Sequence, residues 1–218
     1  MPLRSVLFDL DDTLHDKSAN LAAFARHQYQ AFTLVAHGVE HADWLLKYVE
    51  LNNLRIEKTE VFQLLGTNFG LGETVAEKLR TDFDANSGLQ TRPLPGLMPM
   101  LETCKAMGLR IGVVTNGRDT FQRAKIRGLG IEEVVDAVFT SGGFGVKKPD
   151  PQIFLACLKE LQSSPDTAAM VGDDFVADME PAIFLGMRSI WKSRQVSTKV
   201  DFCSNDLDQI RVYLQSAA

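Results

Sequence analysis

The sequence predicts an α/β fold, in which a Rossmann-like parallel sheet carries helices on both faces and an inserted all-helical subdomain. Three observations support this prediction. An apolar run at residues 3–8 has the character of a buried strand. From residue 98 onward, strand-like and helix-like segments alternate, which is typical of a parallel sheet. Between these two parts, residues 16–87 show helical spacing and no evident strand.

The helical insertion directly follows the first strand. Its apolar residues recur with helical spacing in runs at 22–32, 42–51, 59–65 and 73–83, and the pattern is broken at Gly38, Gly66, Gly70 and Gly72. Prolines and a glycine at 93–99 then interrupt the helical pattern. We therefore predict a core domain made of residues 1–14 and 93–218, and a helical insertion of residues 15–92.

The remainder of the chain alternates between short apolar runs and amphipathic segments. Strands are predicted at 110–115, 137–140, 168–171 and 188–191, and helices at 98–107, 120–127, 151–161, 176–185 and 206–214. Pro151 falls in the first turn of its helix, where proline is tolerated. In such a fold the carboxyl ends of the strands converge on one crevice, where ligands bind.

The composition excludes some classes of protein. Hydrophobic residues make up 45% and charged residues 23% of the 218 residues, as in ordinary globular proteins. The net charge of −5 argues against nucleic acid or an anionic membrane as a partner. We find no bilayer-spanning run and no signal-peptide pattern, and three widely spaced cysteines suit free thiols in a reducing compartment. We therefore expect a cytoplasmic protein; the oligomeric state stays open.

Carboxylates gather at the end of the first predicted strand. Asp9, Asp11 and Asp12 follow its apolar run within four residues, and such close carboxylates raise one another's pKa unless a cation compensates them. In an extended stretch, Asp9 and Asp11 would share one face and Asp12 would take the other. That arrangement suits a nucleophile and a proton shuttle placed two residues apart.

Three further polar segments lie at the ends of predicted strands or just before a helix. They are Thr115-Asn116-Gly117, Lys147-Lys148-Pro149-Asp150-Pro151, and Gly172-Asp173-Asp174 with Asp178 four residues on. With the first segment they supply carboxylates for a hard cation, a hydroxyl beside a backbone amide, and an ammonium. These groups suit phosphoryl transfer.

These four segments together resemble the motifs of the haloacid dehalogenase (HAD) superfamily, whose members are mostly phosphatases. The Asp-x-Asp-x-Thr motif corresponds to Asp9–Thr13, the threonine of the second motif to Thr115, and the lysine of the third to Lys148. The acidic pair of the fourth motif corresponds to Asp173 and Asp178. All four occur in order, and the helical insertion resembles a C1-type cap of the nucleotidase-like and sugar-phosphatase-like members.

The resemblance implies specific catalytic roles. Asp9 would attack phosphorus and form an aspartyl-phosphate. Asp11 would protonate the leaving alcohol and then deprotonate water, so we expect its pKa to be raised in the site. The Thr115 hydroxyl, the Asn116 amide and the Lys148 ammonium would hold the phosphate oxygens.

The resemblance also implies a Mg²⁺ site. Its protein ligands would be the Asp9 and Asp173 carboxylates and the Asp11 main-chain carbonyl, because Mg²⁺ prefers oxygen ligands. Asp178 would orient the metal-bound waters or Lys148. Mn²⁺ or Co²⁺ would also suit such a site.

The expected activity is Mg²⁺-dependent hydrolysis of a small phosphomonoester: a nucleotide, a sugar phosphate or a phosphoglycolate-like acid. A cap that closes over the site favours a small phosphorylated metabolite as substrate. Three alternatives remain. A phosphomutase would keep all four motifs. A 2-haloacid dehalogenase would lack the acid at Asp11 and need no Mg²⁺, and a non-catalytic binding module would have lost Asp9, Asp11 or Lys148.

Other charged residues near the motifs have simpler interpretations. Asp12, Asp150 and Asp174 suit turn or helix-start positions, and Lys147 and Arg123 suit solvated positions. Arg118 could contact a second anionic group of the substrate or face solvent. By position alone, residues just beyond the first motif are candidates for the substrate pocket: His15, Lys17 and Asn20.

Overall fold

A single parallel sheet forms the centre of the core domain in the computed structural model, which describes residues 2–54 and 56–217. Within these residues the sheet has six strands in the order β3-β2-β1-β4-β5-β6. They are β1 (Ser5–Phe8), β2 (Arg110–Thr115), β3 (Ala137–Thr140), β4 (Ala168–Gly172), β5 (Arg188–Trp191) and β6 (Phe202–Cys203). All their pairings are parallel. The predicted α/β class is confirmed.

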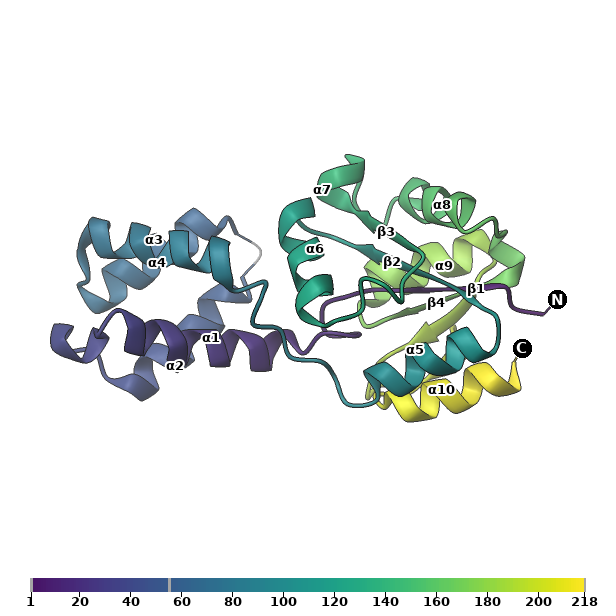
Figure 1. Ribbon diagram of the computed structural model, residues 1–218, viewed down its shortest axis with the longest axis horizontal. Helices are drawn as coiled ribbons and strands as arrows, with labels where there is room; N and C mark the ends of the chain where they lie inside the picture. The colour runs from purple at the N-terminus through teal and green to yellow at the C-terminus, as the bar shows by residue number, and fades with distance from the viewer. Residues whose placement is uncertain (1, 55, 218) are drawn as a thin grey trace. The chain divides into compact units, whose positions relative to one another are not determined.

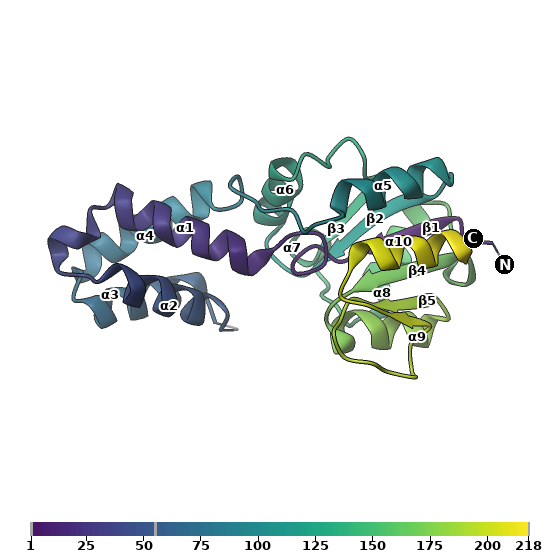
Figure 2. The same ribbon diagram turned by 90° about the horizontal axis from the view of Figure 1, so that it is seen from below.

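Helices cover both faces of the sheet (Figure 1). They are α5 (Leu97–Ala106), α6 (Asp119–Gly128), α7 (Ser141–Phe144), α8 (Pro151–Glu160), α9 (Glu180–Leu185) and α10 (Leu207–Ser216). In Figure 2 the helices α5 and α10 lie together in front of the strands, on the face opposite α8 and α9.

The central strand β1 divides its side chains between two hydrophobic cores. Val6 and Phe8 pack into the core beneath α5 and α10, and Leu7 packs into the core beneath α8 and α9. Successive side chains of a strand point to opposite faces, so a strand buried on both sides must be apolar throughout. This central position brings the end of β1 between the ends of β2 and β4.

Residues Lys17–Arg92 form a second compact unit made of helices. The helices are α1 (Lys17–Ala31), a 3₁₀ turn (Leu34–His37), α2 (His41–Asn52), α3 (Lys58–Phe69) and α4 (Gly72–Asn86). Buried aromatic rings fill its centre: Phe24, Trp44, Tyr48, Phe62 and Phe83. The predicted helical runs fall within these helices, except that α1 ends one residue before Phe32.

Hydrogen bonds close the two ends of this insertion. Asn20, on the first turn of α1, is buried, and its side-chain amide donates to the backbone carbonyls of Ser87 and Gln90. In the core domain, the backbone N–H of Leu94 donates to the carbonyl of Leu14 at 2.9 Å. The chain therefore leaves and re-enters the core domain side by side. Asn20, a candidate pocket residue by position, is a structural residue here.

The chain turns immediately after β1. Asp12 has a left-handed backbone (φ 58°), and its N–H donates to the carbonyl of His15 at 2.7 Å. This turn begins after Asp11, so the expectation that Asp9 and Asp11 share one face of an extended stretch stays a prediction. The two carboxylates have different ion-pair partners, Lys148 for Asp9 and Lys125 for Asp11.

The helix predicted at 176–185 is two elements. Phe175–Met179 forms a π-helical turn, and the α-helix α9 begins only at Glu180. Asp174 caps the π-turn, because its carboxylate accepts from the N–H groups of Val176 and Ala177 at 3.0 Å. Such turns are frequent at functional sites, and this one carries Asp178.

Some smaller features complete the description. The 3₁₀ turn Pro165–Thr167 precedes β4. Cys104, Cys157 and Cys203 are free thiols. Among the helices of the described ranges, none combines the length and the apolarity needed to cross a bilayer.

Candidate active site

A buried lysine joins two of the predicted motifs. Lys148 lies in the loop before α8, and its Nζ donates to Asp9 Oδ1 at 2.5 Å and to Asp178 Oδ1 at 2.6 Å. The side chains of Lys148, Asp9 and Asp178 are only 3%, 9% and 0% exposed. Burial of an ammonium is costly unless it is paired and hydrogen-bonded, so this lysine is held by one carboxylate that directly follows β1 and another on the π-helical turn after β4.

Asp173 completes a cluster of three carboxylates. One ligand oxygen from each of Asp9, Asp173 and Asp178 lies within 4.8 Å of the others. The Thr13 hydroxyl donates to Asp173 Oδ1 at 3.3 Å, and the Trp191 indole donates to the Asp173 carbonyl at 2.8 Å. The first and fourth motifs thus meet at the carboxyl edge of the sheet, where α/β folds bind ligands.

The second motif lies next to this cluster. Thr115 ends β2, is buried, and its hydroxyl accepts from Gln122 Nε2 at 2.7 Å. The Asn116 side chain uses both polar atoms on the Lys148 main chain: Oδ1 accepts from its N–H at 2.9 Å, and Nδ2 donates to its carbonyl at 3.1 Å. Any phosphate contact by Asn116 would therefore come from its backbone N–H.

Asp11 has partners of its own. Lys125 Nζ lies 2.7 Å from each of its carboxylate oxygens, and His15 Nδ1 donates to Oδ1 at 2.8 Å. Gln122 Nε2 lies 3.2 Å from Oδ2. A quarter of the Asp11 side chain is exposed, so the carboxylate is held from one side and accessible from the other.

Burial and mutual repulsion raise the pKa of the clustered carboxyls. For Asp173, burial and the charges of Asp9 and Asp12 raise the pKa to about 7. Burial also raises the pKa of Asp178 to about 7, although Lys148 opposes it. The pKa of Asp9 is raised by burial in the same way. Burial lowers the pKa of Lys148, but Asp9 and Asp178 raise it by more, so the amine stays charged.

The pKa of Asp11 moves in the opposite direction from the sequence-based expectation. Burial raises this pKa, but the Lys125 ammonium and the His15 ring lower it by more, so the net value falls well below the usual range. The predicted upward shift of Asp11 is therefore wrong in this arrangement. Lys125 and His15 stabilise the carboxylate form of Asp11, which is the form that accepts a proton from water.

The donor set fits a divalent cation. Three carboxyl groups face one ammonium in the cluster, so two negative charges remain uncompensated when all three are ionised. Carboxylate oxygens are the ligands that Mg²⁺ prefers, and a cation would relieve the repulsion between them. The Asp11 carboxylate is held by Lys125 and His15, and the cluster includes no oxygen from that side chain.

Sequence reasoning missed two residues of the site and undervalued a third. Gln122 and Lys125 lie three positions apart on α6 and contact Asp11 and Thr115. In the sequence, Lys125 looks like one more charge on an amphipathic helix. The sequence signal that points to them is the Gln-x-x-Lys spacing, which places both side chains on one face of the helix after the second motif. His15, a pocket candidate by position alone, is buried against Asp11.

The simpler interpretations of the remaining charged residues hold at several positions. Asp150 caps α8 by accepting from the Gln152 N–H at 2.9 Å. Arg123 is 46% exposed and pairs with Asp119 at 2.9 Å. Lys147 is exposed, unlike its neighbour Lys148.

Comparisons with known proteins show similarity to phosphatases over most of the chain. Glyceraldehyde 3-phosphate phosphatase from Pyrococcus abyssi is 30% identical over 202 residues, which cover 87% of this chain and 81% of that protein. A HAD phosphatase structure from Thermococcus onnurineus is 25% identical, with a TM-score of 0.68, covering 97% of this chain and 98% of that one. The putative HAD-hydrolase YfnB from Bacillus subtilis, solved with magnesium, shares the fold: its TM-score is 0.78 at 19% identity, covering 99% of this chain and 100% of that one.

The fold, the site and these relatives define the class of this protein: it is a phosphoric monoester hydrolase. The sequence profile described as haloacid dehalogenase-like hydrolase matches residues 3–186, which is most of the chain. The chain belongs to the haloacid dehalogenase-like hydrolase family.

Proposed function

We propose that this enzyme hydrolyses a small phosphomonoester in a Mg²⁺-dependent reaction, with Asp9 as the nucleophile. The observation that carries the proposal is the cluster of Asp9, Asp173 and Asp178 around Lys148, with the Thr115 hydroxyl and the Asp11 carboxylate linked to one another by Gln122. One buried nucleophile, one ammonium and one separate proton carrier are the groups that phosphoryl transfer to a carboxylate needs.

The first half of the reaction breaks the ester. A carboxylate oxygen of Asp9 attacks phosphorus while the bond from phosphorus to the leaving oxygen breaks. The electron pair of that bond stays on the leaving oxygen, which takes a proton from Asp11. This half therefore requires Asp11 to be protonated when substrate is bound, although Lys125 and His15 favour its ionised form in the free site. The Lys148 ammonium and the Thr115 hydroxyl stabilise the charge on the phosphoryl oxygens.

The second half returns the enzyme to its starting state. Water attacks phosphorus, Asp11 takes the proton that the water loses, and the bond between phosphorus and Asp9 breaks. The electron pair of that bond returns to the Asp9 carboxylate. The ionised form of Asp11, which Lys125 and His15 stabilise, is the one that this half requires.

Asp9, Asp173 and the Asp11 main-chain carbonyl would hold the Mg²⁺ ion, with Asp178 orienting its waters or Lys148. When bound, the ion supplies positive charge against the phosphoryl oxygens. The three-carboxylate cluster, with two uncompensated charges, supports this assignment.

The substrate class that we propose is a small phosphorylated metabolite, with sugar phosphates first. The relative from Pyrococcus abyssi is named for glyceraldehyde 3-phosphate, and its similarity runs over 87% of this chain. Nucleotides and phosphoglycolate-like acids are the further members of this class. We also propose that the helical unit Lys17–Arg92 acts as a cap that selects the leaving group.

Phosphate release tests the proposal. Glyceraldehyde 3-phosphate, phosphoglycolate and nucleoside monophosphates are incubated with enzyme and Mg²⁺, with an EDTA arm. Asp9→Asn is the test variant and Asp12→Asn its matched control, since asparagine also tolerates the left-handed backbone at position 12. We expect release by the wild type and by Asp12→Asn, and none with EDTA or with Asp9→Asn.

The same mixtures separate hydrolysis from its alternative. A phosphomutase would yield an isomerised sugar phosphate and little free phosphate. Full activity of Asp9→Asn would refute the covalent mechanism. Undiminished release with EDTA would refute the metal requirement.

A further inference from the structure

Three donors converge on Asp11 from outside the four motifs. Lys125 Nζ lies 2.7 Å from both carboxylate oxygens, His15 Nδ1 lies 2.8 Å from Oδ1, and Gln122 Nε2 lies 3.2 Å from Oδ2. Lys125 and Gln122 both come from α6 (Asp119–Gly128), where a spacing of three residues puts them on one face. The proposed proton carrier is therefore held by a helix that contributes nothing to the carboxylate cluster.

The burial of Lys125 shows that its contact with Asp11 is specific. The Lys125 side chain is 8% exposed, whereas Arg123 and Arg127 on the same helix are 46% and 49% exposed. Its ammonium also lies 4.9 Å from the centre of the Phe121 ring. Burial of an ammonium is unfavourable unless a counter-charge offsets it, and here Asp11 supplies that charge with both oxygens.

Gln122 connects the same carboxylate to the phosphate-binding hydroxyl. Its Nε2 lies 2.7 Å from Thr115 Oγ1 and 3.2 Å from Asp11 Oδ2, and its side chain is buried. Because the Thr115 oxygen accepts from Gln122, its own proton is free to point elsewhere. One amide thus fixes the distance between the proton carrier and the group proposed to bind phosphate.

We propose that Lys125, with Gln122, is a positioning residue for Asp11 in the proposed phosphatase reaction. The ammonium contacts both oxygens, so one oxygen can stay on Lys125 while the other exchanges a proton with the leaving group or with water. The exposed quarter of the Asp11 side chain is the part that would meet substrate. Lys125 acts through Asp11 and not on the phosphate itself.

The choice of leaving group tests this role. A proton donor matters for an alkyl phosphate, whose leaving oxygen is strongly basic, and matters little for 4-nitrophenyl phosphate, whose leaving group departs as a stable anion. The parameter to measure is kcat/KM, because it reports the steps up to the first irreversible one and excludes later hydrolysis of the intermediate. The alkyl substrate is the fastest one of the phosphate-release panel.

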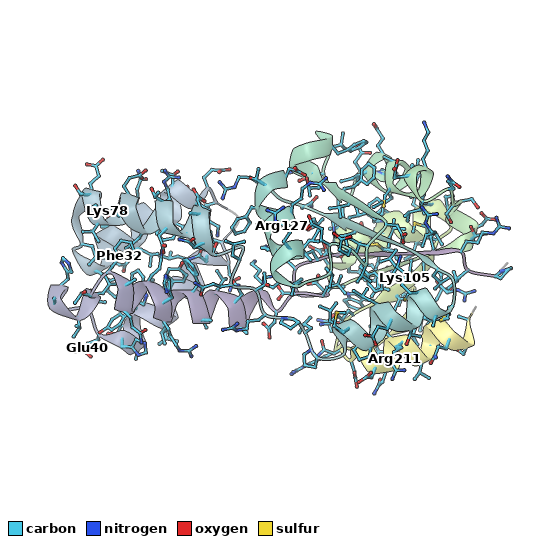
Figure 3. The ribbon with its side chains drawn as sticks, viewed as in Figure 1. Phe32, Glu40, Lys78, Lys105, Arg127 and Arg211 are labelled. Carbon is cyan, nitrogen blue, oxygen red and sulfur yellow. The ribbon has the colours of Figure 1, made fainter. Side chains whose placement is uncertain are left out.

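We expect Lys125→Met to lower kcat/KM for the alkyl phosphate about 10–100-fold, in line with other outer partners of catalytic groups, because the loss of position outweighs the easier protonation of Asp11. We expect a change of less than about threefold for 4-nitrophenyl phosphate, since general acid assistance contributes little there. Asp11→Asn should show the same contrast. Lys125→Arg should recover activity, because a guanidinium also donates to both oxygens of a carboxylate. Arg127→Met on the exposed side of α6 is the matched control (Figure 3).

A double-mutant cycle separates positioning from structural damage. In the Asp11→Asn background, Lys125→Met should add less than about a twofold loss, because its effect runs through Asp11. This double variant also removes both buried partners together and so avoids an unpaired buried ammonium or carboxylate. Circular dichroism and thermal melting check that each variant is folded.

The outcomes are distinct. Equal losses on the two substrates, additive losses in the cycle, or a gain of activity in Lys125→Met would overturn the positioning role and leave the proposed function standing. If the wild type releases phosphate from no substrate, the proposed function fails, and this inference fails with it.

Discussion

Lys148→Met tests most directly whether the Lys148 ammonium stabilises the carboxylate cluster. The Lys148 ammonium lies 2.5 Å from Asp9 Oδ1 and 2.6 Å from Asp178 Oδ1, and 3% of its side chain is exposed. Methionine keeps most of the side-chain volume but removes the charge. The three carboxylates then face one another without their buried cation.

The size of the effect follows from that burial. Removal of one partner from a buried ion pair costs about 3–5 kcal/mol of unfolding free energy, and we expect this loss at pH 8 without metal. Loss of the positive charge that stabilises the phosphoryl oxygens should lower kcat about 10²–10³-fold.

The loss of stability should depend on pH. The pKa of Asp173 and that of Asp178 are raised to about 7, so between about pH 4 and 7 the folded state holds protons that the unfolded state releases. Protonation relieves the repulsion, and the folded state gains relative stability as the pH falls through this range. Lys148→Met should therefore be less destabilising at pH 6 than at pH 8.

Urea unfolding with EDTA at both pH values measures these quantities, and a third series with Mg²⁺ asks whether a divalent cation restores part of the loss. Lys147→Met is the matched control, because this neighbouring lysine is exposed. A Lys148→Met protein as stable as Lys147→Met at pH 8, or equally destabilised at both pH values, would refute the reasoning.

Two further predictions concern the same cluster. Mg²⁺ affinity, measured by calorimetric titration, should fall about tenfold from pH 8 to pH 6, because the proposed ligand Asp173, with a pKa of about 7, must lose its proton to bind metal; equal affinity at both pH values contradicts the assignment. Gly172→Ala should lower kcat about 10–100-fold, because its Cβ would lie 2.6 Å from the Asp178 Cβ and would displace that carboxylate from Lys148. Wild-type kinetics in a folded Gly172→Ala protein would show that the site tolerates the shift.

Much of the core domain could be predicted from local pattern. The strands at 110–115, 137–140 and 188–191 have the predicted bounds, because each is a short apolar run between polar or turn-forming residues. The π-helical turn at Phe175–Met179 could not be predicted, since an extra residue in a helical turn leaves the apolar pattern almost unchanged.

The partners of Asp11 could not be predicted from local sequence pattern, for a different reason. Lys125 is 114 positions away in the sequence. Their meeting depends on which face of α6 packs against the loop that follows β1. Sequence periodicity identified α6 as amphipathic but did not tell a buried lysine from a solvated one. The direction of the Asp11 pKa was wrong for this reason.

The closed ends of the helical insertion have a consequence for the assembly of the chain. The central strand β1 is made first, yet its neighbours β2 and β4 begin only at residues 110 and 168. Hydrogen bonds from Asn20 to the carbonyls of Ser87 and Gln90 allow the insertion to fold as its own unit and to bring its ends together. The effective loop between β1 and β2 then shrinks from about 100 residues to about 30, which lowers its closure entropy cost by roughly 1 kcal/mol. With such an insertion, the pairing of β1 with β2 can form during synthesis at the entropy cost of a much shorter loop.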